Sequence, residues 1–311
     1  MLTIGKPLDT MELKELARVR AAPFLLRLIV LAVLAAAAAA VIAAARGWLA
    51  LAAMAMLGQL FAHGVELEHQ TLHNTAFRGR SWNRGVGFML GLPMLVSFSD
   101  YQWSHLRHHR TLGTKSDREF FNDGFERLTS LPALLVHLLM LRHWRAVAQA
   151  IAGALIGRLR PDVKRETAMR LRAEYRWMGA IVIAAAGLSL AFHTLLAVKL
   201  WLVPLLFAMP THALIELPEH WDRDHETPDL SRNTRTIRAG AFAFWFTNGN
   251  NYHTEHHWLP AVPNDRFPEL HRQISDQIET ETYLAFYRRF FGEVYRNTTS
   301  RRGPQSNASA S

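Results

Sequence analysis

Long uncharged runs alternate with polar, strongly basic stretches along this chain. The first two runs extend from Leu28 to Ala45 and from Trp48 to Val65, and only Arg46 and Gly47 separate them. At a rise of about 1.5 Å per helical residue, each run is about long enough to cross a hydrocarbon core of roughly 30 Å. The two runs therefore predict a hairpin of two transmembrane helices.

A second pair of apolar runs occurs at 178–198 and 200–215, with Lys199 between them. A single apolar hairpin could lie in the core of a soluble protein, but two such pairs favour an integral membrane protein. Pro204 and Pro210 are expected to kink the last helix. We therefore predict an all-α membrane protein with four spans in two hairpins, at about 28–45, 48–65, 178–198 and 200–215.

The segments outside the predicted spans are polar enough to form a cap on one side of the membrane. The apolar runs at 86–98 and 131–156 are short or interrupted by charge, which is typical of helices that lie on the bilayer surface. A further amphipathic helix is predicted near 266–291. The pattern predicts one helical domain over residues 1–297, with a cap formed by 66–177 and 216–297, and a disordered tail over 298–311.

The chain carries 35 Lys and Arg residues against 26 Asp and Glu residues, a formal net charge of +9. The basic residues flank the apolar runs, while the two hairpin turns hold only Arg46 and Lys199. Positively charged loops stay on the cytoplasmic side, so we expect both termini and the cap to be cytoplasmic. Basic faces interleaved with aromatic residues, which bind nucleic acid, are not evident, and no nucleic-acid partner is predicted.

Three compact histidine clusters carry the candidate chemistry. They read HQTLH over 69–73, HLRHH over 105–109 and HTEHH over 253–257. On a helix, residues three or four apart project from one face, so each cluster would present its imidazoles together. Eight imidazoles exceed the four ligands of one tetrahedral zinc, and the count favours two metal ions. The predicted metal ligands are His69, His73, His105, His108, His109, His253, His256 and His257.

Ligand chemistry alone does not identify the metal, because neutral imidazole binds iron, copper, zinc and nickel. The order HxxxH, HxxHH and HxxHH, between and after apolar segments, resembles the membrane fatty-acid desaturase and hydroxylase superfamily. The contexts HNTAF, HLRHHRTLGTKSD and NNYHTEHHWLPAVP are similar to its bacterial fatty-acid desaturases and to the related carotenoid ketolases. The resemblance extends over about residues 48–275.

This resemblance implies a centre of two non-haem iron ions that uses dioxygen, with a further histidine just beyond the fourth span. His220 occupies that place, while His212 and His225 are the alternatives. It also implies a fatty-acyl or other lipid substrate, and we expect the protein in a bacterial inner membrane. Electrons would come from a separate ferredoxin or cytochrome b5 with its reductase, because the sequence has no cysteine, no HPGG haem motif and no GxGxxG dinucleotide motif.

Polar residues beside the histidine clusters are candidates for orienting the ligands. A metal-bound imidazole usually donates its second ring N–H to a carboxylate, carbonyl or water. Turn formation explains the asparagines of NGNN equally well. The candidates are Asp100, Asp117, Glu216, Asn250 and Asn251, with Glu66 and Glu68 beside the first cluster.

The histidine pattern does not separate desaturation from hydroxylation, because both begin with removal of hydrogen from an unactivated C–H bond. The local contexts favour introduction of a double bond into a fatty-acyl chain, and hydroxylation or ketolation of a lipid or carotenoid is the alternative. A metal-transporting or metal-storing membrane protein would hold its ligands near mid-membrane. Here the clusters lie outside the predicted spans, which favours an enzyme.

Overall fold

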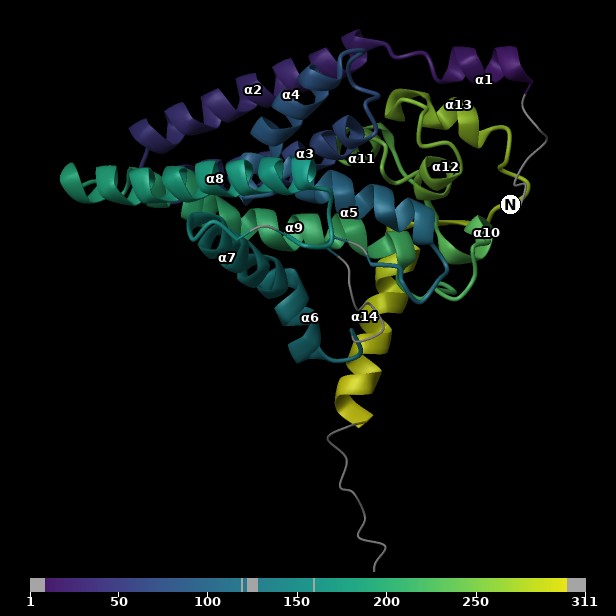
Figure 1. The fold of residues 1–311 in the computed structure, drawn as a ribbon. Helices are drawn as coiled ribbons and strands as arrows, with labels where there is room; N and C mark the ends of the chain where they lie inside the picture. The colour runs from purple at the N-terminus through teal and green to yellow at the C-terminus, as the bar shows by residue number, and fades with distance from the viewer. Residues whose placement is uncertain (1–8, 119, 122–127, 159, 301–311) are drawn as a thin grey trace, which may run out of the picture.

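The computed structural model describes residues 9–118, 120–121, 128–158 and 160–300 of the 311-residue chain. Four long helices form its membrane-facing part, α2 (Ala21–Ala44), α3 (Gly47–Leu72), α8 (Arg165–Ala191) and α9 (Val203–His220). In Figure 1 the turns that join α2 to α3 and α8 to α9 lie at the left, and the small helices of the cap gather at the right. The chain can reverse sharply between α2 and α3 because Gly47 has a φ of +62°.

The other elements are short. In chain order they are α1 (Thr10–Leu16), α4 (Arg80–Gly91), η1 (Leu92–Met94), α5 (Phe98–Thr111), α6 (Leu131–Leu138), α7 (Leu141–Leu155), the π-helical turn η3 (Val198–Leu202), α10 (Leu230–Asn233), β1 (Thr236–Arg238), α11 (Ala241–Phe246), α12 (His253–Trp258), η4 (Asn264–Arg266), α13 (Phe267–His271), β2 (Thr280–Thr282) and α14 (Tyr283–Ser300). The apolar runs predicted at 86–98 and 131–156 correspond to α4 with η1 and to α6 with α7.

Within the described residues, three helical segments are long and apolar enough to cross a membrane: Thr10–Ala44, Gly47–Leu72 and Val198–His220. They contain the first, second and fourth predicted spans. The third differs, because α8 ends at Ala191 and a turn with positive φ at His193 follows. The apolar part of α8, residues 178–191, is about 21 Å long at about 1.5 Å per residue, so the fourth membrane crossing stays a prediction.

Helix α3 is the central helix of the bundle and packs against α2, α4 and α9. Its crossing with α9 is close, because a Cβ atom added to Gly58 would lie 2.2 Å from the carbonyl oxygen of Pro204 and 2.9 Å from Cβ of Phe207. Small residues allow such close approach of helices in membrane proteins. This contact fixes the depth of α9 along α3, and both helices end in histidines of the candidate site.

The cap contains the one departure from an all-α fold among the described residues. Strands β1 and β2 form a two-stranded parallel sheet in which Thr236 lies opposite Thr280. Residues 266–291 are consequently not one helix: the chain forms α13, then β2, then α14. Glu281 pairs with the buried Arg235 at 2.7 Å, and this tertiary contact overrides the local helical pattern.

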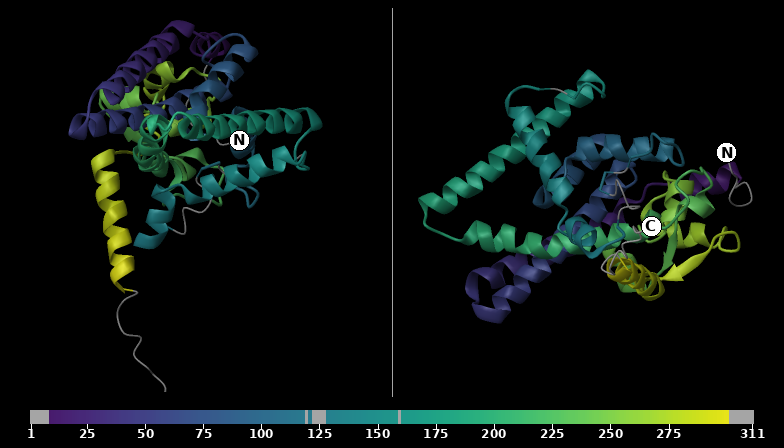
Figure 2. Two further views of the ribbon diagram at one scale, coloured as in Figure 1. Left: turned by 90° about the vertical axis from the view of Figure 1, so that its left-hand side faces the viewer. Right: turned by 90° about the horizontal axis from the view of Figure 1, so that it is seen from below.

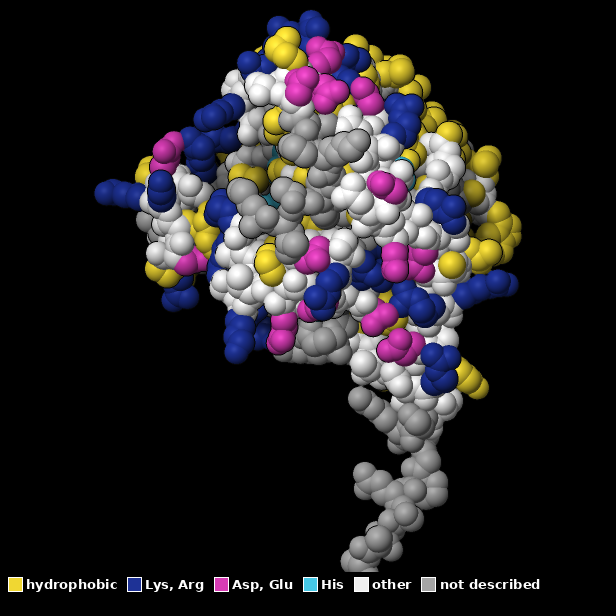
Figure 3. Space-filling view, turned by 90° about the vertical axis from the view of Figure 1, so that its right-hand side faces the viewer, with side chains coloured by type: hydrophobic (Ala, Val, Ile, Leu, Met, Phe, Trp, Pro, Cys, Tyr) yellow, Lys and Arg dark blue, Asp and Glu magenta, His cyan; other side chains and the backbone are white. Residues whose placement is uncertain are grey.

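Helix α14 extends away from the body of the molecule, as the left view of Figure 2 shows. Phe286 and Phe290 are fully buried and attach its first half to Trp221. The helix continues to Ser300, past the predicted start of the tail at 298, and residues 301–311 lie outside the described part of the chain. Acidic and basic side chains are interspersed on the face at the cap end (Figure 3).

Replacement of Gly58 by alanine should destabilise the bundle by about 1–3 kcal/mol, because the added methyl group would overlap the backbone of α9. Thermal unfolding of the detergent-solubilised protein measures this effect. Gly187→Ala in α8 is the matched control, since a Cβ atom at Gly187 meets nothing within 4 Å. Equal unfolding temperatures of the two variants would contradict the close crossing.

Candidate metal centre

Four helices from distant parts of the chain bring nine histidines together. The C-terminal end of α3 carries the first cluster, α5 carries the second, and α9 ends at His220. The short helix α12 carries the third cluster and lies across the ends of the others, where Figure 1 shows it beside α11 and α13. All nine side chains are buried or nearly so.

One group consists of four histidines whose ligating nitrogens lie within 4.8 Å of one another. His105 is its centre: its Nε2 lies 2.9 Å from Nε2 of His69, 2.9 Å from Nε2 of His73 and 3.2 Å from Nε2 of His256. Residues from α3, α5 and α12 therefore share one small space.

A second group has the same character and lies beside the first. Its members are His108, His220, His253 and His257. Nε2 of His220 lies 3.2 Å from that of His108 and 2.9 Å from that of His253, and His257 is 3.0 Å from His253. Residues of α5, α9 and α12 form this group, so each of the second and third sequence clusters contributes to both.

His109 lies at the boundary between the groups. Its Nε2 is 3.0 Å from Nε2 of His105 and 2.9 Å from Nε2 of His256, both of the first group. Its ring stacks on His257 of the second group, with centroids 4.2 Å apart. The two groups thus form one continuous centre.

The second ring nitrogen of several of these histidines contacts an acceptor oxygen. Such contacts place the ring hydrogen on Nδ1 and leave the lone pair of Nε2 directed at the shared space. The contacts are His69 Nδ1 to Asn250 Oδ1 at 2.9 Å, His108 Nδ1 to Asp117 Oδ1 at 2.8 Å, and His220 Nδ1 to the carbonyl oxygen of Asn233 at 2.9 Å.

Burial disfavours the protonated form of six imidazoles outside the spans. Burial, reinforced by the neighbouring imidazoles, lowers the pKa of His73, His105, His109, His253, His256 and His257 well below the usual range. Nitrogen lone pairs that face one another at about 3 Å repel unless a cation lies among them. Nitrogens bound to one ion at about 2.0–2.1 Å lie about 3 Å apart, so the donors fit two metal ions.

Buried carboxylates surround this neutral cluster. Glu66 and Glu255 are fully buried, and Glu216 and Glu219 are 4% and 6% exposed. Oε1 of Glu219 lies 3.4 Å from Nδ1 of His253. Burying negative charge without compensation is costly, and a cationic centre a few ångströms away supplies compensation that neutral imidazoles do not.

Among the polar residues expected beside the ligands, Asn250 and Asp117 contact site histidines and two others do not. Asp100 pairs with Arg160 and accepts a hydrogen bond from Tyr175. Asn251 donates to the carbonyl oxygen of Ile237 and so holds strand β1. Glu216 forms a further buried group with Glu66 and His212.

The structure also separates the three candidates for the ninth histidine. Nε2 of His220 faces the second group, His225 is exposed, and Nδ1 of His212 lies 3.1 Å from Oε1 of Glu66. His212 therefore reaches the centre only through a chain of contacts: Glu66 accepts a 2.6 Å hydrogen bond from Asn250, which in turn contacts His69.

Sequence reasoning missed Asn233 and Glu219. The carbonyl oxygen of Asn233 contacts His220 from a turn that only the folded cap brings near, and no local signal indicates it. Glu219 directly precedes His220, and this adjacency was a usable signal. Glu68, also beside a ligand in sequence, faces Gly91 of α4 and not the histidines.

Residues 45–290 match the family model for fatty acid desaturase, which covers most of the chain. The chain belongs to the fatty acid desaturase family. A comparison with characterised proteins adds a sphingolipid delta(4)-desaturase, DES1 of Drosophila melanogaster, which is 27% identical over 246 residues. That alignment covers 75% of this chain and 68% of the fly protein.

Family membership confirms what the histidine clusters predicted about the superfamily. This desaturase-family chain is an integral membrane protein, and its described residues include three helical segments long and apolar enough to span the bilayer. It is an oxidoreductase of lipids at the level of the family. The nine clustered histidines lie inside the matched region, so the site and the family match concern the same part of the chain.

Asn250→Ala should weaken metal binding about 10- to 100-fold, because it removes the oxygen that orients His69 and the bridge to Glu66. Metal content after titration with a competing chelator measures the effect. Asn83→Ala is the control: it removes another buried amide, whose hydrogen bonds are with the backbone of Phe77 and Gly79 and not with a site histidine. Equal metal retention by the two variants would show that Asn250 does not orient a ligand.

Proposed function

We propose that this chain is an oxygen-dependent diiron oxidoreductase that introduces a double bond into a fatty-acyl chain of a lipid or acyl thioester. The observation that carries the proposal is the pair of four-histidine groups, with nitrogens about 3 Å apart and His109 between them. Membership of the fatty acid desaturase family supports it, because the match includes all three histidine clusters.

In this proposal the first iron is held by His69, His73, His105 and His256, the second by His108, His220, His253 and His257, with His109 beside both. Two irons with dioxygen would supply the oxidising power for unactivated C–H bonds. The balanced reaction takes two hydrogens from adjacent carbons, and with two further electrons and two protons it converts dioxygen to two waters. Asn250, Asp117 and Asn233 keep the ligands in the required tautomer.

An apolar cluster leads from the spans to the first histidine group and suits a hydrocarbon chain. Tyr101 lies against His105 with ring centroids 5.8 Å apart, and Phe121 lies 5.2 Å from Tyr101. Phe121 also packs on His212 at 4.4 Å. These rings continue into a core with Met94 and other residues of the bundle. They would exclude water from the reacting carbons and direct an acyl chain toward the centre.

The basic loops favour a cytoplasmic cap with both termini on that side, within one domain over residues 1–297. We expect the protein to lie in a bacterial inner membrane. The chain has no cysteine, so the two electrons would come from a separate ferredoxin or cytochrome b5 and its reductase.

Hydroxylation or ketolation would use the same metal centre. The family description and the name of the fly relative both favour formation of a double bond. That relative acts on a sphingolipid, so both acyl lipids and sphingolipids belong among the substrates to be tested.

Mass spectrometry of total lipids from cells that express the chain tests the reaction. We expect a new species lacking two hydrogens, absent with His256→Ala and present with the control His225→Ala, which changes an exposed histidine outside the site. A species that gains oxygen would move the protein to hydroxylation or ketolation. Identical lipids from wild type and His256→Ala would contradict a lipid-modifying role of this centre.

Metal analysis of the purified protein tests the ligands independently of the substrate. We expect about two irons per chain, with loss of iron in His108→Ala while the variant stays in the membrane fraction, because His108 contacts the site residues Asp117 and His220. Readily exchanged zinc in place of iron would favour a metal-binding role without oxidation chemistry.

A further inference from the structure

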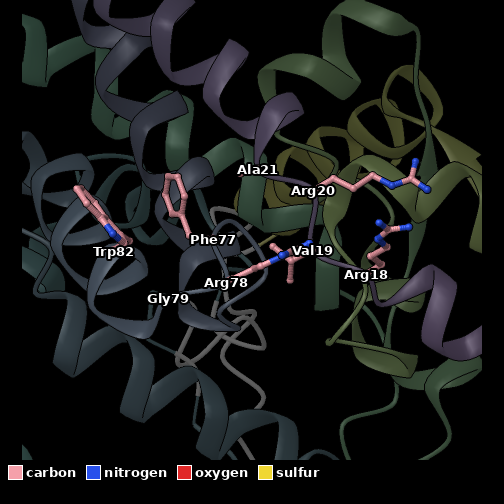
Figure 4. Close-up of a pocket in the computed structure, with 8 residues that line it drawn as sticks. All are labelled: Arg18, Val19, Arg20, Ala21, Phe77, Arg78, Gly79 and Trp82. Carbon is pink, nitrogen blue, oxygen red and sulfur yellow. The ribbon is translucent and has the colours of Figure 1, made fainter.

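A cleft of about 710 Å³ lies where the chain enters its first apolar helix, away from the histidine centre. One wall is the link between α1 and α2, and the other is the loop after α3 with the first turn of α4 (Figure 4). The lining residue Phe77 is held in place, because its ring packs edge-on against the buried Phe24 with centroids 5.3 Å apart. The residues that line the cleft are Arg18, Val19, Arg20, Ala21, Phe77, Arg78, Gly79 and Trp82.

The polar half of this lining is entirely basic. Arg18, Arg20 and Arg78 contribute three guanidinium groups, and no acidic residue lines the cleft. Glu15 engages Arg20 at 2.8 Å and Arg18 at 3.7 Å from outside the lining. For Arg78 the described part of the chain shows no ion pair, and Figure 4 shows its side chain extending between the walls toward Val19. With three arginines against one glutamate, the cleft therefore offers net positive charge to an anion.

The other half of the lining is apolar and opens onto exposed hydrocarbon. Trp82 is 69% exposed at the rim. Beyond it, Leu26 and Ile29 on α2 are 63% and 57% exposed, and Met89 on α4 is 63% exposed. Large apolar side chains on a candidate span face lipid, and tryptophan favours the level of the lipid headgroups. A small water-soluble anion would make no contact with this apolar surface, whereas the acyl chains of a lipid would.

We propose that the cleft binds an anionic glycerophospholipid, with its phosphate held by Arg78, Arg20 and Arg18 and its acyl chains along α2 and α4. Guanidinium groups suit phosphate because they offer several N–H donors in one plane. The cleft lies at the start of α2, the long helix of the candidate span Thr10–Ala44. A bound lipid would connect α2 to the loop before α4, where the Phe24–Phe77 pair already joins the two segments.

Native mass spectrometry of the purified, delipidated protein with added phosphatidylglycerol or phosphatidylcholine tests this site. We expect phosphatidylglycerol to bind more tightly than phosphatidylcholine. Arg78→Gln should weaken phosphatidylglycerol binding about fivefold, the usual contribution of one basic residue at a membrane surface. Arg80→Gln is the matched control, because Arg80 is an exposed arginine of the same segment that does not line the cleft.

Four outcomes would overturn the proposal. Equal weakening by Arg78→Gln and Arg80→Gln would show general surface charge, and equal affinity for the two lipids would remove the role of the negative charge. Displacement of phosphatidylglycerol by equimolar inorganic phosphate would identify a site for free anions and not for lipid. Trp82→Ala should also weaken phosphatidylglycerol binding. Unchanged binding would show that the cleft recognises the phosphate alone and not the hydrocarbon part of a lipid. Because Arg78 and Trp82 do not contact the histidines, metal content reports whether each variant is folded.

Discussion

The mutual repulsion of the nitrogen lone pairs in nine crowded imidazoles is the constraint on which the rest of this structure depends. Their Nε2 atoms face inward at about 3 Å, an arrangement that is favourable only around cations. The groups around the imidazoles stabilise this arrangement. Carbonyl, amide and carboxylate oxygens hold the outer ring nitrogens, and buried glutamates supply negative charge. The close crossing of α3 and α9 then sets the height at which the two sets of ligands meet.

Local spacing selected eight of the nine histidines that lie together, and the family resemblance added His220, but neither predicted how they divide into two groups. His105 and His108 lie on one turn of α5, yet they join different groups, and His256 separates from His253 and His257 in the same way. The division depends on where α5 and α12 cross the ends of α3 and α9, and a single sequence does not contain that geometry. The neighbouring asparagines show the same limit: Asn250 faces His69, and Asn251 faces strand β1.

The fold was predictable where burial in lipid dominates and less so where tertiary contacts decide. Continuous apolar runs located α2, α3 and α9, because an unbroken hydrophobic stretch has few alternatives to a span. The third run failed to continue through 198, since the turn at His193 ends α8. In the cap, the pairing of β2 with β1 and the ion pair between Glu281 and Arg235 interrupted a helix that periodicity alone had predicted.

The small parallel sheet has a consequence for the length of chain that the centre requires. All nine histidines lie before residue 258, but β1 is held by β2, which begins only at Thr280. Strand β1 in turn exchanges hydrogen bonds with Asn251, and Thr236 donates to Glu255 at 2.6 Å inside the third histidine cluster. A chain shortened to end just after its last ligand would thus keep every donor atom. It would lose strand β2, and with it the pairing that holds β1 and, through β1, the orientation of α12.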